Sequence, residues 1–207
     1  MEYFTQYGGE YIRLVIEHLQ ISLLAIIVSI IMGIVLGIVA TRFNKTEKTL
    51  LFLASHLRII PSLAVLIFLV PYLGTGLMPT LVALVLLGIP PVLLNTIKGI
   101  NNVPEYVVEA ALGMGYDKRT LFRKIVFPLA LPVIFNGIQI TTTEVIASTT
   151  LAAYIGAGGL GELIMSGVGL MRFDYLWIGG LSVSAISLMA MLMLTGIRRF
   201  LRKYEII

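Results

Sequence analysis

Long uncharged apolar segments dominate this chain and set its expected architecture. Residues 21–40 form a run of twenty without a charged side chain. A helix needs about 20 mostly apolar residues to cross the hydrocarbon core of a bilayer, so a first transmembrane span is expected over residues 16–41. No small-residue cleavage site follows this run, which distinguishes it from a signal peptide. Within it, Gly33 and Gly37 form a GxxxG pattern that lets another helix approach closely.

A second uncharged stretch, residues 59–97, is long enough for two crossings. A glycine- and proline-containing turn signal at residues 73–79 divides it, so we expect spans over residues 50–72 and 79–96. Prolines are tolerated in lipid where neighbouring helices satisfy the freed backbone groups, which predicts kinked helices packed against other protein. The prolines concerned are Pro61, Pro71, Pro90 and Pro91.

The second half of the chain adds one long polar stretch and two more apolar spans. The polar stretch covers residues 98–124, and apolar residues return over 128–153 and 175–197. Residues 156–161 satisfy GxGxxG, but they follow a membrane span rather than a strand, so an outer turn is expected instead of a dinucleotide site. The whole pattern predicts a single all-α polytopic membrane domain over residues 1–207, with five transmembrane helices.

Composition supports a membrane environment and excludes several kinds of chemistry. The 207 residues are 58% hydrophobic and 13% charged, with a mean hydropathy of +0.98, whereas soluble domains carry about 25% charged residues. Without cysteine there is no disulfide, thiolate metal site or cysteine nucleophile. His18 and His56 lie too far apart in sequence for a metal-ligand spacing, and no GxxxxGK[ST] motif occurs. We therefore expect no metal, cofactor or catalytic site in this chain.

Basic residues are concentrated in a way that indicates orientation. Thirteen of the fifteen lysines and arginines fall in three clusters. Short loops rich in these residues stay on the cytoplasmic side, so the net charge of +4 reports topology rather than a nucleic-acid ligand. With five spans, an outside N-terminus and a cytoplasmic C-terminus place every cluster on the cytoplasmic face. The clusters are Arg42, Lys45, Lys48 and Arg58; Lys98, Lys118, Arg119, Arg123 and Lys124; and Arg198, Arg199, Arg202 and Lys203.

The polar stretch between the third and fourth spans is expected to begin with a short helix over residues 104–112. Asn102 followed three positions later by Glu105 resembles a capping box, and Pro104 suits the first helical turn. Gly113 then breaks the helix.

A second short helix is expected to complete this cytoplasmic loop. Gly115 allows the chain to reverse, and Asp117 is placed to cap a helix that runs to Lys124. Ala110 and Ala111 offer little side chain, so the two helices should form a compact knob that a partner's groove can reach closely. Glu109 is placed to pair with a cation in the loop or on that partner.

The residues of this knob resemble the EAA loop of permeases from binding-protein-dependent ABC importers. The family pattern is EAA, three residues, Gly, nine residues, Ile, one residue and Leu-Pro, and this chain departs from it only at Phe127, where the family has Leu. In that family the loop is a coupling helix that docks in a cleft of the nucleotide-binding subunit. The resemblance implies a multi-pass transport subunit of the bacterial cytoplasmic membrane, not an enzyme. The matching positions are Glu109, Ala110, Ala111, Gly115, Ile125 and Pro128.

Three further segments resemble permeases of the glycine betaine, carnitine and choline importers: residues 58–64, 68–76 and 154–161. This resemblance covers essentially the whole chain and implies alternating-access transport of a small quaternary-amine osmoprotectant. It also implies two ATPase subunits that bind ATP and Mg²⁺, a second permease copy or homologue, and an extracytoplasmic solute-binding protein. Methionine and phosphonate importer permeases share the size and the loop, so they stay as alternatives for the solute.

Glu144 is an ionisable residue expected at membrane depth, in the polar segment 141–150 of the fourth span. Such residues are costly and usually face a partner or a water-filled path. One interpretation is that Glu144 lines a translocation path with Thr141 and Thr142, where its charge favours a cationic or zwitterionic solute. The other is a buried carboxylate bonded to neighbouring helices. A different class of protein, a channel or mechanosensitive pore, would use Glu144 as a selectivity ring.

Overall fold

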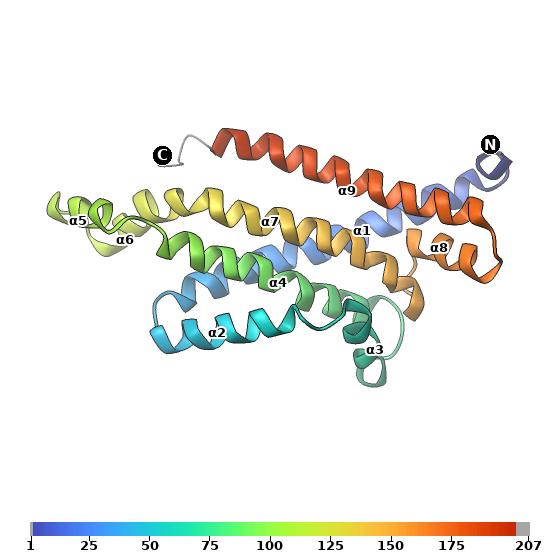
Figure 1. The fold of residues 1–207 in the computed structure, drawn as a ribbon, viewed down its shortest axis with the longest axis horizontal. Coiled ribbons are helices and arrows are strands. Elements are labelled where there is room, and N and C mark those ends of the chain that lie inside the picture. The colour runs from blue at the N-terminus through green and yellow to red at the C-terminus, as the bar shows by residue number, and fades with distance from the viewer. Residues whose placement is uncertain (1, 202–207) are drawn as a thin grey trace.

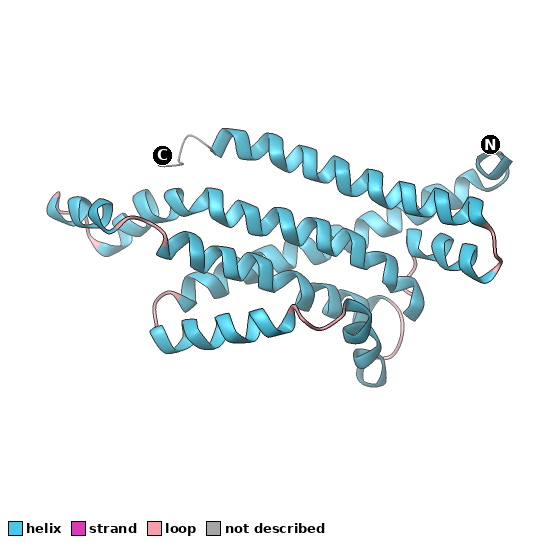
Figure 2. Cartoon of the chain, in the orientation of Figure 1, coloured by secondary structure: helices cyan, strands magenta, loops and turns pink. Residues whose placement is uncertain are grey.

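A computed structural model describes residues 2–201 of the chain, and all regular structure in these residues is helical. Figures 1 and 2 show the helices arranged as an elongated bundle without strands in the described part. The all-α prediction is therefore confirmed. The elements are α1 (Glu2–Ala40), α2 (Asn44–Leu57), α3 (Ser62–Leu73), α4 (Leu77–Asn101), α5 (Glu105–Gly113), α6 (Lys118–Leu121), the π-helical turn η1 (Phe122–Val126), α7 (Phe127–Thr149), the 3₁₀ helix η2 (Thr150–Ile155), α8 (Leu160–Gly169) and α9 (Phe173–Leu201).

Helices α1, α4 and α7 form the packed centre of the bundle, with α4 between the other two. Close approach of α1 to α4 depends on the GxxxG glycines. A Cβ atom at Gly33 would lie 2.6 Å from the Cβ of Val92, and one at Gly37 would lie 2.6 Å from the Cβ of Thr96. The GxxxG pattern thus serves helix packing, as the sequence suggested.

The prolines of α4 lie inside this packed centre. Pro90 and Pro91 are buried, and polar side chains bind the backbone around them. Asn95 Nδ2 donates to the carbonyl oxygen of Pro91 over 2.8 Å, and Thr141 Oγ1 donates from α7 to that of Gly88 over 2.8 Å. The expected packing of proline-containing helices against other protein is observed for this pair.

The second expected span, residues 50–72, is broken. Helices α2 and α3 meet at a bend of 99°, where Pro61 precedes α3 and cannot donate a backbone hydrogen bond. The sequence predicted a kink at the prolines of this span but not a bend of this size, because the residues on both sides of the break are apolar. Four helical stretches of the described residues are long and apolar enough to cross a membrane, or five if the bent pair counts as one span.

Helix α9 lies beside α7 and α8 but leaves most of its surface uncovered. About 11% of its apolar stretch is buried, against 50% for α4. Lipid or another protein must therefore cover α9 in the membrane.

The glycine-rich segment before α8 forms a turn, as expected. Gly156, Gly158 and Gly159 all have positive φ, and the amide of Gly159 donates to Glu17 Oε2 over 3.2 Å. This bond ties the turn to α1.

Candidate coupling loop and translocation path

The polar loop forms an exposed helical knob at one end of the bundle (Figure 1). Its first helix, α5, begins one residue later than expected and lacks a side-chain cap, since Pro104 occupies the N-cap position. The predicted capping role of Asn102 is therefore wrong. Asn102 instead ends α4, where its amide bonds back to the carbonyl oxygens of Ile100 and Lys98.

Gly115 provides the reversal between α5 and α6. Its φ is +85°, a conformation that glycine adopts without a Cβ penalty. The amide of Gly115 donates to the carbonyl of Leu112, and that of Tyr116 donates to the carbonyl of Ala111. This pair of bonds is the Schellman arrangement that ends a helix at a left-handed glycine.

Asp117 caps the second helix, as the sequence predicted. Its Oδ2 accepts hydrogen bonds from the amides of Arg119 and Thr120 over 3.0 and 3.3 Å. Hydrogen bonds from Thr120, and then from Arg119, stabilise the carboxylate and hold the pKa of Asp117 below its ordinary value. The cap is therefore complete at neutral pH and is lost only as the pH falls through this lowered pKa.

The outer surface of the knob is partly apolar. Tyr106 and Met114 expose 66% and 69% of their surface, and Leu112 exposes 48%. Glu109 and Ala110 are exposed beside them, whereas Ala111 is buried within the knob. Of the two alanines whose small side chains were expected to allow close approach of a partner, Ala110 therefore lies on the knob surface and Ala111 lies inside the knob. Among the described residues Glu109 makes no ion pair, so its carboxylate is accessible on the knob surface.

The knob joins the fourth apolar span without a break. The sequence predicted that a helix ends at Lys124, but α6, η1 and α7 continue into one another. Pro128 lacks the amide that would bond to Lys124 in a regular helix, and the amide of Phe127 instead bonds to the carbonyl of Phe122. Ile125 and Pro128 are half-buried along this segment. A continuous helical connection therefore runs from the knob into the bundle.

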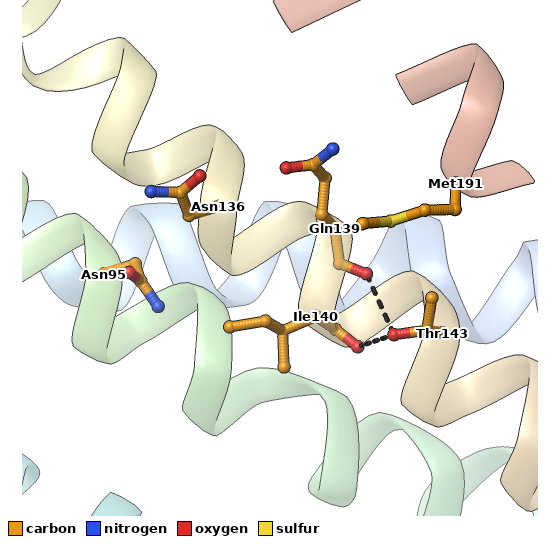
Figure 3. Close-up of a pocket in the computed structure, with 6 residues that line it drawn as sticks. All are labelled: Asn95, Asn136, Gln139, Ile140, Thr143 and Met191. Atoms are coloured by element: carbon orange, nitrogen blue, oxygen red, sulfur yellow. Dashed lines mark hydrogen bonds between the residues drawn. The ribbon is translucent and has the colours of Figure 1, made fainter. Parts of the chain in front are cut away.

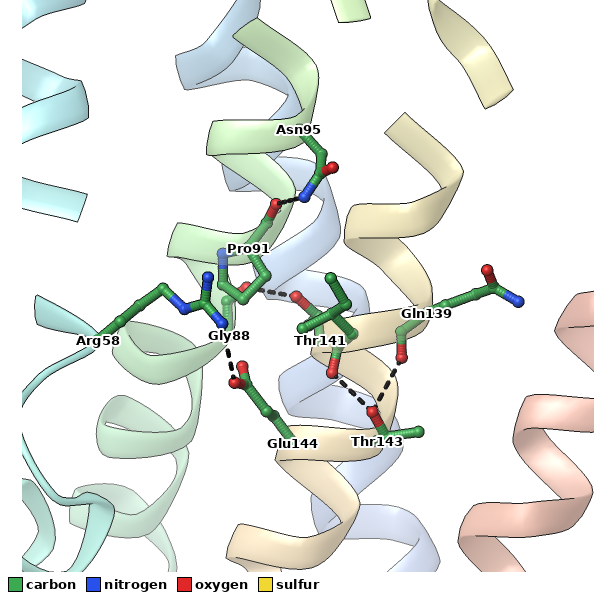
Figure 4. Close-up of polar contacts among 9 residues, drawn as sticks. Arg58, Gly88, Pro91, Asn95, Gln139, Thr141, Thr143 and Glu144 are labelled. Atoms are coloured by element: carbon green, nitrogen blue, oxygen red, sulfur yellow. Dashed lines mark hydrogen bonds and ion pairs between the residues drawn. The ribbon is translucent and has the colours of Figure 1, made fainter. Parts of the chain in front are cut away.

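Glu144 lies on α7, about 25 Å along the helix from Phe127 at 1.5 Å per residue. Its Oε1 is 3.5 Å from Nη2 of Arg58, and the two side chains are 44% and 43% exposed. Figure 4 shows the two groups facing each other across the gap between α7 and the α2–α3 break. Glu144 is thus not the fully buried carboxylate of the structural interpretation.

The position of Arg58 corrects the assignment made from charge clustering. The sequence placed it with Arg42 in a cytoplasmic group. In the structure, the fourteen residues of α2 carry it about 21 Å from the α1–α2 turn. It therefore lies within the bundle, at the break that separates α2 from α3 (Figure 4).

The two threonines proposed for the path have other contacts. Thr141 is fully buried and binds α4 through the carbonyl of Gly88, and Thr142 is nearly buried and donates to the carbonyl of Ile138 in its own helix. Of the three candidates, Glu144 is the one that lines an open cleft in this conformation. That cleft has a volume of about 310 Å³ and also contains Arg58, Ser62 and Ser148.

A second polar pocket, of about 420 Å³, lies between α4, α7 and α9. Figure 3 shows the amide side chains of Asn95 and Asn136, with Gln139 and Thr143 along the same side of α7. Gln139 Nε2 donates to Thr195 Oγ1 of α9 over 3.2 Å. The sequence reasoning missed this pocket, although three amide side chains in otherwise apolar spans were a usable signal.

These features define a class of protein: a helical membrane bundle with polar groups inside it and an exposed helical knob at one end. The chain belongs to the family of binding-protein-dependent transport system inner membrane components, whose family profile matches residues 15–203. It is therefore a transport component of the cytoplasmic membrane rather than an enzyme, and the ATPase is a separate subunit in such systems.

Two curated relatives cover most of the chain. It is 35% identical over 188 residues to the choline transport system permease protein OpuBB of Bacillus subtilis, covering 91% of this chain and 87% of the relative. It is 36% identical over 186 residues to the carnitine transport permease protein OpuCB of Listeria monocytogenes, covering 90% and 85%.

A solved structure confirms the fold. An inward-facing structure of the MetNI methionine ABC transporter matches with a TM-score of 0.76 and 20% identity, covering 95% of this chain and 96% of the matched one. At this identity the likeness establishes the fold and says nothing about the solute.

Proposed function

We propose that this chain is the permease subunit of an ABC importer for a small quaternary-amine osmoprotectant such as glycine betaine, carnitine or choline. The observation that carries the proposal is the match over nine-tenths of the chain to permeases of choline and carnitine transport. The EAA-type knob, exposed at the end of the bundle, fits a subunit driven by a separate ATPase.

The proposed topology has five crossings, with α2 and α3 together counted as one, an outside N-terminus and a cytoplasmic C-terminus. Figure 1 shows the α1–α2 turn, the knob and the C-terminal part of α9 at the same end of the bundle. Arg42 of the turn lines a cleft with Lys118, Arg119 and Arg123. Cations from separate parts of the sequence therefore gather at one end, as the positive-inside rule requires of a cytoplasmic face.

The proposed assembly contains two ATPase subunits, which bind ATP and Mg²⁺, and a second permease copy or homologue. Tyr106 and Met114 offer apolar surface for the ATPase cleft, beside the carboxylate of Glu109. The uncovered surface of α9 leaves room for a permease partner. A separate extracytoplasmic binding protein delivers the solute, in line with the binding-protein-dependent family to which the chain belongs.

The proposed mechanism is alternating access driven from the knob. ATP binding closes the ATPase pair, the knob moves with it, and the continuous α6–η1–α7 segment transmits that movement into the bundle. Glu144 lies on this segment and lines the proposed path, where its carboxylate favours a solute with a cationic group. Thr141 of the same helix joins α7 to α4 through its hydrogen bond to the carbonyl of Gly88.

The direct test is uptake of labelled glycine betaine by proteoliposomes that contain this chain with its ATPase and binding protein. We expect uptake against a gradient with internal ATP and none with ADP. Downhill uptake with ADP would indicate a channel instead. ATP-dependent uptake of methionine or a phosphonate, without uptake of quaternary amines, would assign the chain to the alternative importer types.

A further inference from the structure

Arg58 and Glu144 form an ion pair that is open and weakly held. A single nitrogen–oxygen contact of 3.5 Å joins them, and each side chain is more than two-fifths exposed. Strong pairs between arginine and carboxylate are bidentate, with shorter contacts. A pair that served only to hold α7 against the α2–α3 break would be expected to be shorter and shielded from water.

The cleft around this pair has the features of a small-molecule site. Its volume of about 310 Å³ is at the lower end of the range for ligand pockets. Arg58 and Glu144 are the charged groups among its described lining residues, with hydroxyl groups from Ser62 and Ser148 and apolar walls from residues such as Leu87. Broken helices inside membranes are tolerated where they line a polar space, and transporters use such breaks for substrate sites.

We propose that Arg58 and Glu144 form a site in the translocation path that binds zwitterionic solutes through both of their charges. This inference rests on the proposed importer function. The quaternary ammonium group of the solute binds Glu144, and its carboxylate binds Arg58. Before the solute arrives, Arg58 neutralises Glu144; once it is bound, each protein charge has a solute partner.

Exchange of partners keeps the cleft electrically neutral throughout. One ion pair and one zwitterion become two ion pairs, with no charge left uncompensated at membrane depth, where it would be costly. A purely cationic solute such as choline replaces Arg58 at Glu144 but leaves the guanidinium without a carboxylate. The site therefore favours zwitterions over cations of similar size.

The test compares uptake of glycine betaine with uptake of choline for two charge-neutralising variants. Arg58→Gln removes the partner of the solute carboxylate and frees Glu144, so the betaine-to-choline ratio should fall about tenfold. Glu144→Gln leaves Arg58 to repel cations and attract carboxylates, so the ratio should rise by a similar factor. Opposite shifts from two residues of one ion pair distinguish solute recognition from a structural role.

Matched variants distinguish a change in solute preference from a non-specific loss of folding or transport. Arg42→Gln removes an arginine from the other cleft and should leave the ratio unchanged, and Arg58→Lys should keep the preference for betaine. Ratios that stay constant, or that shift in the same direction in both neutralising variants, would overturn the proposal. If the unaltered protein takes up neither solute with ATP, the proposed function itself fails.

A labelling experiment tests the site without changing its charges. The chain has no cysteine, so Ser148→Cys places its one thiol in the cleft. We expect a high concentration of glycine betaine to slow modification by a trimethylammonium methanethiosulfonate, and choline to slow it less. Thr143→Cys, in the other polar pocket, should show no protection. Equal rates with and without betaine at Ser148→Cys would contradict binding at this site.

Discussion

At the scale of single residues, the shape of the knob depends on Gly115. Its positive φ and the two bonds that end α5 there place the exposed surface of Tyr106 and Met114 relative to α6. No atom lies within 4 Å of a Cβ built at this position. A side chain at this position would therefore act through backbone strain rather than through a clash inside the subunit.

We predict that Gly115→Val uncouples the permease from its ATPase. A non-glycine residue in a left-handed conformation costs about 1–2 kcal/mol. We expect the knob to relieve this strain by adopting a different turn between α5 and α6, while the membrane helices keep their packing. The variant should insert normally but lose co-purification with the ATPase and solute-stimulated ATP hydrolysis. Gly113→Ala, which also has open space around it but lies within α5, is the control. An intact, fully stimulated Gly115→Val complex would remove the coupling role from this loop.

At the scale of elements, apolar runs predicted which segments are helical but not how the helices bend or join. The prolines predicted a kink in the second span, but the 99° bend after Arg58 was not foreseen, because residues 59–73 are apolar whether the chain runs straight or turns. The grouping of basic residues by sequence then placed Arg58 beside Arg42 at the end of the bundle, whereas it lies at the break between α2 and α3. The junction at η1 was missed because Pro128 usually marks a helix start, whereas here a π-helical turn accommodates it. Both errors concern three-dimensional contacts that a linear pattern does not record.

The same junction gives a prediction about force transmission. Pro128→Ala restores the missing amide and allows regular α-helical bonding through η1. Each residue in an α-helix adds about 100° of rotation, so removal of the π turn should reorient the knob relative to α7. We expect lower uptake and weaker ATPase stimulation with unchanged expression. Pro132→Ala, in the same helix but outside the π turn, should retain coupling. Full transport by Pro128→Ala would show that this junction does not set the orientation of the knob.

At the scale of the whole molecule, sequence patterns were most informative where one rule applied along the full chain. Hydrophobic run length identified the helical membrane bundle, and the spacing from Glu109 to Pro128 identified the loop that became the exposed knob. The site around Glu144 was only half predictable. Its charge within an apolar segment was visible in the sequence, but its partner, Arg58, lies 86 positions away and meets it because α2, α3 and α7 all pack against α4.

The orientation of the bundle is the prediction on which the coupling mechanism depends, and the absence of native cysteine makes it directly measurable. Met114 is exposed on the knob and Leu170 is exposed between α8 and α9, at opposite ends of the bundle (Figure 1). A thiol reacts as the thiolate, which requires water, so a charged, impermeant maleimide reports the side that each position faces. Met114→Cys should be labelled only when the reagent reaches the cytoplasmic side, and Leu170→Cys in intact cells. Labelling of Met114→Cys from outside would place the knob beyond the reach of any cytoplasmic ATPase and would contradict the importer mechanism.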